Sequence, residues 1–141
     1  MELKFSVQTK IQKPVDEVFD AVRDPEKLAK YFATGGASGP LEEGSAVTWR
    51  WADHPGAVGN VQVRKVVRNR SIVFEWATGS ITTRAEFKFE SLNARETLVS
   101  ITESGWDADE KGLKASYGNC NGWTRTLDAL KAWLEHGIIL R

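Results

Sequence analysis

Apolar and polar residues alternate strictly at the start of the chain. Leu3, Phe5, Val7 and Ile11 fall on one face of an extended segment, and lysines, a serine and a glutamine fall on the other. A period of two is typical of a half-buried strand. The same alternation recurs in residues 46–51, 58–67, 72–76, 81–90 and 96–104. We therefore predict six strands, the last five of which are joined by short turns and so form an antiparallel sheet.

Helical patterns occupy two places. Pro14 and Asp24-Pro25 each open a short segment with one apolar side, as expected for two short helices after the first strand. Residues 33–45 are rich in glycine and have no period, which predicts a loop. After the last strand, large apolar residues recur at three-four spacing from Trp123 to Leu134, and this spacing predicts a long amphipathic helix.

The segment "YGNCNGW" (117–123) complicates the start of that helix. Gly118 and Gly122 each cost about 1 kcal/mol of helix propensity relative to alanine. Lying four residues apart, they share one stripe, where the helix either approaches the sheet closely or leaves volume for a ligand. We interpret the segment as the hinged lid of a cavity. The alternative is a plain loop, with the helix starting only near Asn121 or Gly122.

These elements define an α+β fold. One face of the sheet is polar and the other is apolar. The apolar face must be buried against another element, and only one long helix is available for this. We predict a curved six-stranded antiparallel sheet wrapped around the long C-terminal helix, with two short helices between strands 1 and 2. The length of 141 residues fits a single domain, 1–141.

The composition narrows the classes of partner and compartment. There are 19 basic and 19 acidic residues, so the surplus positive charge that nucleic-acid binding needs is absent. No apolar run approaches the ~20 residues of a spanning helix, and the N-terminus lacks the pattern of a signal peptide. The lone cysteine, Cys120, rules out an internal disulfide and fits a reducing compartment. We expect a soluble, cytoplasmic protein without membrane insertion, as a monomer or weak dimer.

Catalytic and metal-binding patterns are scarce. His54 lies in a predicted turn and His136 at the end of the last helix, where a cation suits the helix dipole. No His, Cys and Asp cluster has the spacing of metal ligands. Cys120 has no histidine nearby in sequence, and a lone cysteine on a helix is usually a small buried hydrophobe. We predict no catalytic residue, no metal and no cofactor.

Aromatic residues are the more informative set, with six tryptophans in the chain. The aromatic residues on the strands fall at alternate positions and so lie on one face of the sheet. Other aromatic residues lie on the elements expected to close over that face. Either these side chains fill an ordinary core, or they line a hollow core that holds an apolar ligand. On the second interpretation the ligand-binding residues are Phe32, Trp49, Trp51, Trp76, Phe87, Glu103, Trp106, Tyr117, Cys120 and Trp123.

Glu103 is the one acidic member of that set. Its parity places it on the face of Val99 and Ile101. A buried carboxylate must meet water, a base or a ligand, because leaving it unpaired costs several kcal/mol. Lys114 or Arg125 on the last helix is a candidate partner. The alternative is that Glu103 lies at the strand end and reaches solvent.

Four segments together resemble a known family. They are the helix pair "PVDEVFDAVRDPEKLAKYF" (14–32), the hairpin "GNVQVRKVVRNRSIVFEW" (59–76), the strand end "TLVSITESGW" (97–106) and the helix start "GWTRTLDALKAWLE" (122–135). They resemble the helix-grip fold of the START/birch-pollen-allergen-like (SRPBCC) superfamily. Within it, the chain is similar to bacterial domains homologous to the activator of the heat-shock protein 90 ATPase. The resemblance implies lipids, polyketides or aromatic molecules as ligands, and a contact with a chaperone in the stress response.

Three functions follow as expectations. The first is non-enzymatic binding of a small hydrophobic or amphipathic ligand between the sheet and the C-terminal helix. The second is an enzyme of the polyketide cyclase or hydrolase type, with Glu103 as general base and Tyr117 or a tryptophan N–H orienting the substrate. The third is an interaction module akin to the chaperone-ATPase activator, which would present an exposed apolar patch.

Overall fold

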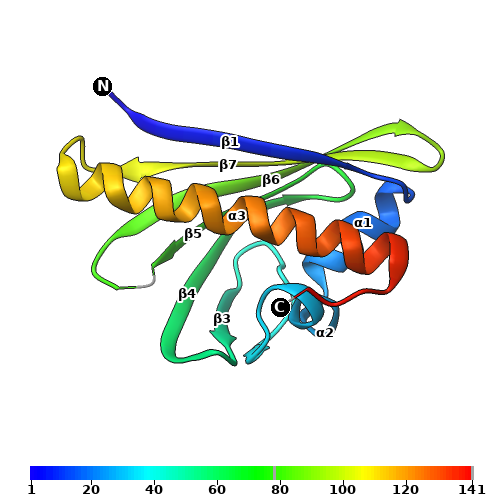
Figure 1. Cartoon of the computed structure of the whole chain (residues 1–141), viewed down its shortest axis with the longest axis horizontal. Helices are drawn as coiled ribbons and strands as arrows, with labels where there is room; N and C mark the ends of the chain where they lie inside the picture. The colour runs from blue at the N-terminus through cyan, green and yellow to red at the C-terminus, as the bar shows by residue number, and fades with distance from the viewer. Residues whose placement is uncertain (78, 141) are drawn as a thin grey trace.

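A computed structural model describes residues 1–77 and 79–140 of the chain. In chain order the elements are β1 (Leu3–Ile11), α1 (Val15–Arg23), α2 (Pro25–Tyr31), β2 (Gly36–Ala37), β3 (Ala46–Trp51), β4 (His54–Val67), β5 (Ser71–Ala77), β6 (Thr82–Asn93), β7 (Glu96–Trp106) and α3 (Glu110–His136). The α+β class, the two short helices after the first strand and the long C-terminal helix are confirmed. Figure 1 shows α3 running across one face of the sheet.

The strands form one open antiparallel sheet in the order β1-β7-β6-β5-β4-β3-β2. The predicted number of six strands is too low by one. The additional strand is β2, whose two residues pair with Trp49 and Arg50 of β3 inside the segment predicted as a loop. A strand of two residues is too short to produce a recognisable alternation, so periodicity could not reveal it.

One predicted turn also differs. His54 was predicted to lie in a turn but begins β4, so the turn after β3 is confined to Ala52 and Asp53. The link predicted between the strands 72–76 and 81–90 includes Thr78, which lies outside the described residues.

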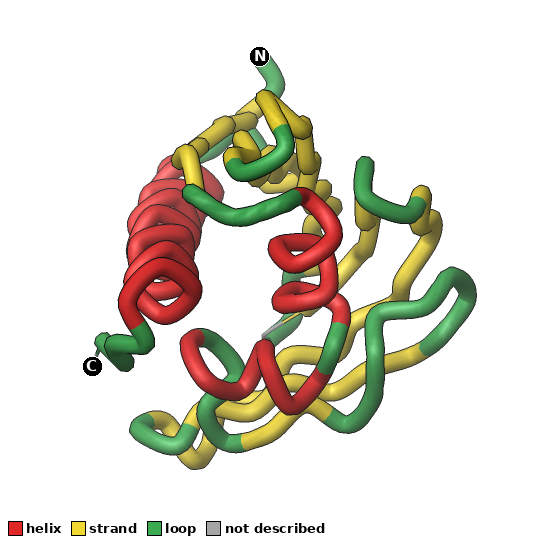
Figure 2. Tube along the Cα trace, turned by 90° about the vertical axis from the view of Figure 1, so that its right-hand side faces the viewer, coloured by secondary structure: helices red, strands yellow, loops and turns green. Residues whose placement is uncertain are grey.

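The core lies between the sheet and the three helices. Figure 2 shows the sheet bending around α3, and Figure 1 shows α1 and α2 at one end of the molecule. Trp123, Leu127 and Leu130 of α3 are buried against the sheet. These are residues that the three-four spacing placed on the inner face of the helix, and their burial explains where the long helix sits.

The helix α3 is continuous through the glycine-containing segment. Asp109 caps its start by accepting a hydrogen bond from the backbone N–H of Gly112 at 2.7 Å. The alternative, in which the helix starts only near Asn121 or Gly122 after a plain loop, is therefore wrong. The expectation for the glycine stripe is also wrong: Gly118 and Gly122 are exposed, and no atom lies within 4 Å of a Cβ built on either. They neither bring the helix close to the sheet nor leave space beneath it.

Glu135 fastens the end of α3 to the end of β1. Its carboxylate accepts from the backbone N–H of Gln12 and from Lys131 Nζ, each at 2.8 Å. Burial by itself raises the pKa of Glu135, but these hydrogen bonds and the neighbouring positive charge outweigh it. The pKa of Glu135 therefore lies below its ordinary value of 4.5.

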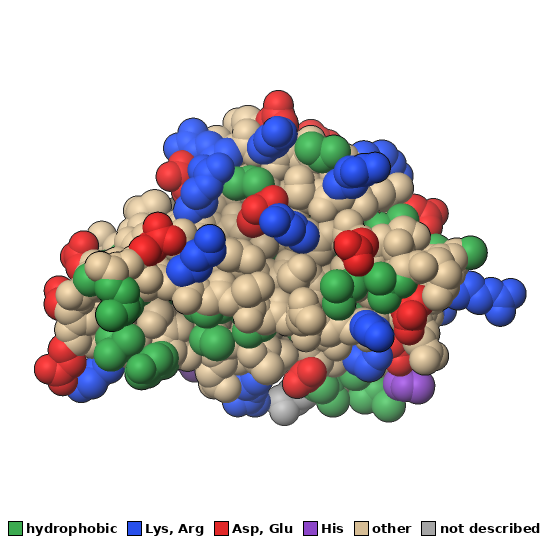
Figure 3. Space-filling model, turned by 90° about the horizontal axis from the view of Figure 1, so that it is seen from above, with side chains coloured by type: hydrophobic (Ala, Val, Ile, Leu, Met, Phe, Trp, Pro, Cys, Tyr) green, Lys and Arg blue, Asp and Glu red, His purple; other side chains and the backbone are tan. Residues whose placement is uncertain are grey.

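The surface carries charges of both signs. On the face seen in Figure 3, Lys and Arg side chains are interspersed with Asp and Glu, so neither sign forms a continuous patch there. None of the helices within the described part of the chain combines the length and apolar character needed to cross a membrane.

Candidate functional site

Glu103 lies on the buried face of β7. The strand alternates in burial, and Val99, Ile101 and Glu103 are all 0% exposed. The predicted inward face is thus confirmed, and the alternative that Glu103 reaches solvent is wrong. The reason is that β7 does not end at residue 104, as the pattern indicated, but continues to Trp106.

Four neutral groups donate hydrogen bonds to this carboxylate. Trp76 Nε1 and Thr83 Oγ1 donate to Oε2 at 2.9 and 2.5 Å, and Trp123 Nε1 donates to Oε1 at 2.8 Å. Asn119 Nδ2 lies 3.2 and 3.1 Å from the two oxygens. The donors come from β5, β6 and α3, so Glu103 joins the sheet to the long helix.

The predicted basic partners are wrong. Lys114 pairs instead with Glu110 at 3.2 Å, and Arg125 is exposed. Across residues 1–77 and 79–140, no lysine, arginine or histidine forms an ion pair with Glu103. The negative charge is balanced by the dipoles of N–H and O–H groups alone.

This arrangement fits an ionised carboxylate. An ionised carboxylate only accepts hydrogen bonds and has about four accepting positions, which matches the four donors. Hydrogen bonds to a charged acceptor are also roughly twice as strong as neutral ones. For Glu103 to accept a proton from a substrate, one of these donors would first have to leave.

Gly105 sets the direction in which β7 ends. Its φ is +117°, a backbone conformation that residues other than glycine rarely adopt. A Cβ added at this position would lie 3.3 Å from Thr83 Cα. The following residue, Trp106, stacks on Phe5 with ring centroids 5.6 Å apart and is only 7% exposed. The glycine thus allows β7 to pass close to β6 and to place the Trp106 indole at the end of the sheet.

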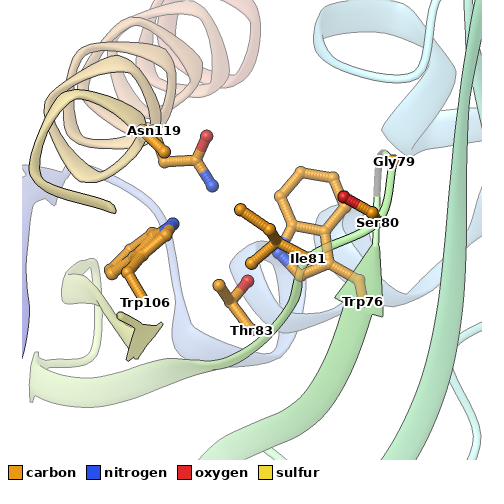
Figure 4. A pocket seen from close by; sticks show the side chains of 8 residues that line it. Trp76, Gly79, Ser80, Ile81, Thr83, Trp106 and Asn119 are labelled. Atoms are coloured by element: carbon orange, nitrogen blue, oxygen red, sulfur yellow. The ribbon is translucent and has the colours of Figure 1, made fainter. Parts of the chain in front are cut away.

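A pocket of about 160 Å³ lies beside the carboxylate. Its walls are Trp76, Gly79, Ser80, Ile81, Thr83, Trp106, Ala115 and Asn119. Figure 4 shows Trp76 and Trp106 on either side of this space, with Asn119 of α3 above it. Trp76, Thr83 and Asn119 belong both to the pocket wall and to the donors of Glu103, so the carboxylate lies directly behind the wall.

Most other aromatic residues of the predicted site pack against one another. Trp123 stacks on Phe32 at a centroid distance of 5.1 Å and meets Phe87 edge-to-face at 5.5 Å. Trp49 is buried between Phe32 and Trp76, and Trp51 is partly buried against Phe32. These residues fill the interior, as the alternative of an ordinary core proposed.

Two predicted residues lie away from the pocket. Tyr117 is 65% exposed on the outer side of α3, and Cys120 is partly exposed. Of the ten predicted residues, Trp76 and Trp106 line the pocket and Glu103 stands behind it.

Sequence reasoning missed Thr83 and Asn119 as parts of the site. Thr83 shares the inward parity of Ala85 and Phe87, and that was the available signal. Asn119 precedes Trp123 by one helical turn, so both reach the same carboxylate once α3 is known to extend upstream.

No group of three His, Cys, Asp or Glu side chains in the described ranges is arranged to hold a metal ion.

The open antiparallel sheet bent around a long C-terminal helix, with two short helices after β1, defines a helix-grip domain. The family profile described as "Activator of Hsp90 ATPase homolog 1-like protein" matches residues 12–135. The chain therefore belongs to this family, as the four sequence segments predicted.

Solved structures share the fold over nearly the full chain. The protein SSP2350 from Staphylococcus saprophyticus is 29% identical, with a TM-score of 0.82, and the match covers 99% of this chain and 96% of that one. The Aha1 dimer from Colwellia psychrerythraea is 23% identical, with a TM-score of 0.78 and coverage of 96% and 98%. An HSP90 activator from Plasmodium falciparum is 19% identical, with a TM-score of 0.74 and coverage of 94% and 96%. No curated protein matches the sequence.

Proposed function

We propose that this protein binds a small, partly apolar molecule in the pocket between β5, β6 and the N-terminal half of α3. The observation that carries the proposal is the wall of this pocket, which combines two indoles with the polar side chains of Thr83, Ser80 and Asn119. Apolar walls with a few fixed polar groups are typical of small-molecule sites.

The volume indicates the size of the ligand. A dry cavity of roughly 150 Å³ is enough for benzene, and the pocket here is about 160 Å³. This supports a ligand, or a ligand end group, of about one aromatic ring. Among the expected classes, a small aromatic or amphipathic molecule is favoured over a whole lipid or polyketide.

The size of the ligand also sets the affinity that we expect. A ligand of about eight non-hydrogen atoms that gains roughly 0.5–0.7 kcal/mol per atom binds with a dissociation constant on the order of 0.1–1 mM. Screening must therefore use millimolar concentrations of probe.

A pair of matched variants tests the proposal. Trp106→Leu removes one wall of the pocket, whereas Trp133→Leu removes a partly buried indole that stacks on Tyr31 at 6.0 Å, away from the pocket. Titration of single-ring aromatic probes, followed by intrinsic fluorescence, should give saturable binding that Trp106→Leu weakens and Trp133→Leu leaves unchanged. Absence of binding by every probe at 10-fold the expected constant, on the order of 10 mM, would contradict the proposal.

A second candidate is contact with a chaperone ATPase. Leu113 and Tyr117 lie one turn apart on the outer side of α3 and are 38% and 65% exposed, which supports a protein-contacting face. Stimulation of a heat-shock protein 90 ATPase that Leu113→Ser/Tyr117→Ser removes and Trp106→Leu preserves would support this candidate. The enzyme alternative has less support, because the described donors already occupy Glu103.

A further inference from the structure

We infer that the molecule taken by this pocket is a cation, such as a protonated amine or a methylated ammonium. The inference rests on the proposed function and specifies its ligand class. It follows from the juxtaposition of the buried carboxylate of Glu103, whose donors among the described residues are all neutral, with the two indoles of the pocket wall.

A carboxylate lies behind the wall of the pocket. Glu103 is 0% exposed, and its hydrogen-bond donors within residues 1–77 and 79–140 are all neutral. No lysine, arginine or histidine is among the described residues that line the pocket. A negative charge that is neither exposed to water nor paired with a cation acts strongly on its surroundings, because the protein interior screens it less than water does. The pocket lies one side chain away from Glu103 and offers a place for a positive charge, because Trp76, Thr83 and Asn119 both line it and contact the carboxylate.

Two indoles form walls of the pocket. Trp76 and Trp106 stand on opposite sides of the same space (Figure 4). The face of an indole attracts a cation more strongly than those of the other aromatic side chains, and pairs of such faces form the cages that recognise quaternary ammonium groups. The same two walls provide apolar contact for methyl groups or a short hydrocarbon part.

The polar groups of the pocket wall disfavour an anionic ligand. Trp76 Nε1, Thr83 Oγ1 and Asn119 Nδ2 are donors on the wall that would otherwise bind an anionic group. All three already donate to Glu103. An anion in the pocket would therefore meet a buried negative charge without these donors to compensate for it.

Three probes of similar size and different charge separate this inference from the proposed function. They are benzylamine, which is a cation at neutral pH, benzyl alcohol, which is neutral, and benzoate, which is an anion. We expect benzylamine to bind roughly tenfold more tightly than benzyl alcohol at low ionic strength, and benzoate to bind most weakly. If benzyl alcohol binds as tightly as benzylamine, the cation inference is wrong and the proposed function stands. If none binds, both are wrong.

Two variants test which residues create the preference. Glu103→Gln removes the charge and keeps the size of the side chain, so the ratio of the two affinities should fall from roughly tenfold to near one. Should this variant unfold, Trp106→Leu supplies an independent test, because Trp106 donates no hydrogen bond to Glu103. In Trp106→Leu, benzylamine should lose at least about threefold more affinity than benzyl alcohol. Equal losses for the two probes would overturn the inference.

Discussion

Replacing Glu103 with leucine tests the role of the buried carboxylate in holding the fold. The substitution puts an apolar side chain of similar size in place of the carboxylate. It thereby removes the two oxygens that accept the hydrogen bonds of the four donors. Trp76, Thr83 and Trp123 are 8%, 5% and 2% exposed, so their donors cannot turn to water when the acceptor is lost. We therefore expect Glu103→Leu to lower the free energy of unfolding.

The magnitude follows from two opposing contributions. Each buried donor left without a partner costs about 1–3 kcal/mol, so three such donors cost roughly 3–9 kcal/mol. Removing the carboxylate from a buried position returns several kcal/mol of desolvation. The net expected loss is about 1–5 kcal/mol, which is a substantial part of the 5–15 kcal/mol that holds a typical domain folded.

Urea unfolding followed by tryptophan fluorescence and circular dichroism measures this loss. Glu90→Leu is a matched control, because Glu90 is an exposed glutamate on β6 and its replacement should change stability by no more than about 0.5 kcal/mol. A second substitution, Trp76→Phe, removes one donor and should cost less in the Glu103→Leu background than in the wild type. If Glu103→Leu is as stable as Glu90→Leu, the donors do not depend on the carboxylate and the reasoning is refuted.

Three further predictions concern the backbone and one titrating group. Gly118→Ala combined with Gly122→Ala should raise the free energy of unfolding by about 1–2 kcal/mol in a urea titration, because both glycines are exposed within a continuous helix; an unchanged midpoint would contradict this. Gly105→Ala should lower it by about 1–3 kcal/mol and shift the indole N–H signal of Trp106, because alanine is strained at a φ of +117°. Glu135 has a lowered pKa in the folded state, so its contribution to stability is present above 4.5 and is lost as pH falls through the folded-state value. Stability measured against pH should therefore decline less over this range in Glu135→Gln than in the wild type, and parallel curves would show that Glu135 contributes nothing.

The fold could be predicted from sequence where the hydrophobic period was long and regular. The alternation through Val99, Ile101 and Glu103 correctly placed three residues on one face, because every second residue of a strand points the same way. The three-four spacing after Trp123 correctly located the long helix. Periodicity failed at β2, which has only two residues, and at the upstream half of α3, where polar residues and glycines hide the helix.

The site was harder to predict because its parts meet only in three dimensions. The inward parity of Glu103 was visible, but its donors lie 16 to 27 residues away along the chain. A basic partner was the natural expectation for a buried acid, yet two indoles, a hydroxyl and an amide serve instead. The aromatic residues alternate along the strands, which places them on one face of the sheet. This pattern is the same whether large side chains line a cavity or fill the core, so it could not distinguish the two. The structure places most of them in a filled core and leaves a small pocket at one edge.

The proposed function is tested most directly by the indole N–H signals of the six tryptophans in nitrogen-15 NMR spectra. Benzylamine is titrated into the protein up to the order of 10 mM, about tenfold above the weakest expected dissociation constant. The signals of Trp76 and Trp106 should shift in a saturable manner, while that of Trp133 at the other end of α3 stays in place. If the two pocket signals do not move, or if all six move together without saturation, the pocket beside Glu103 is not a binding site.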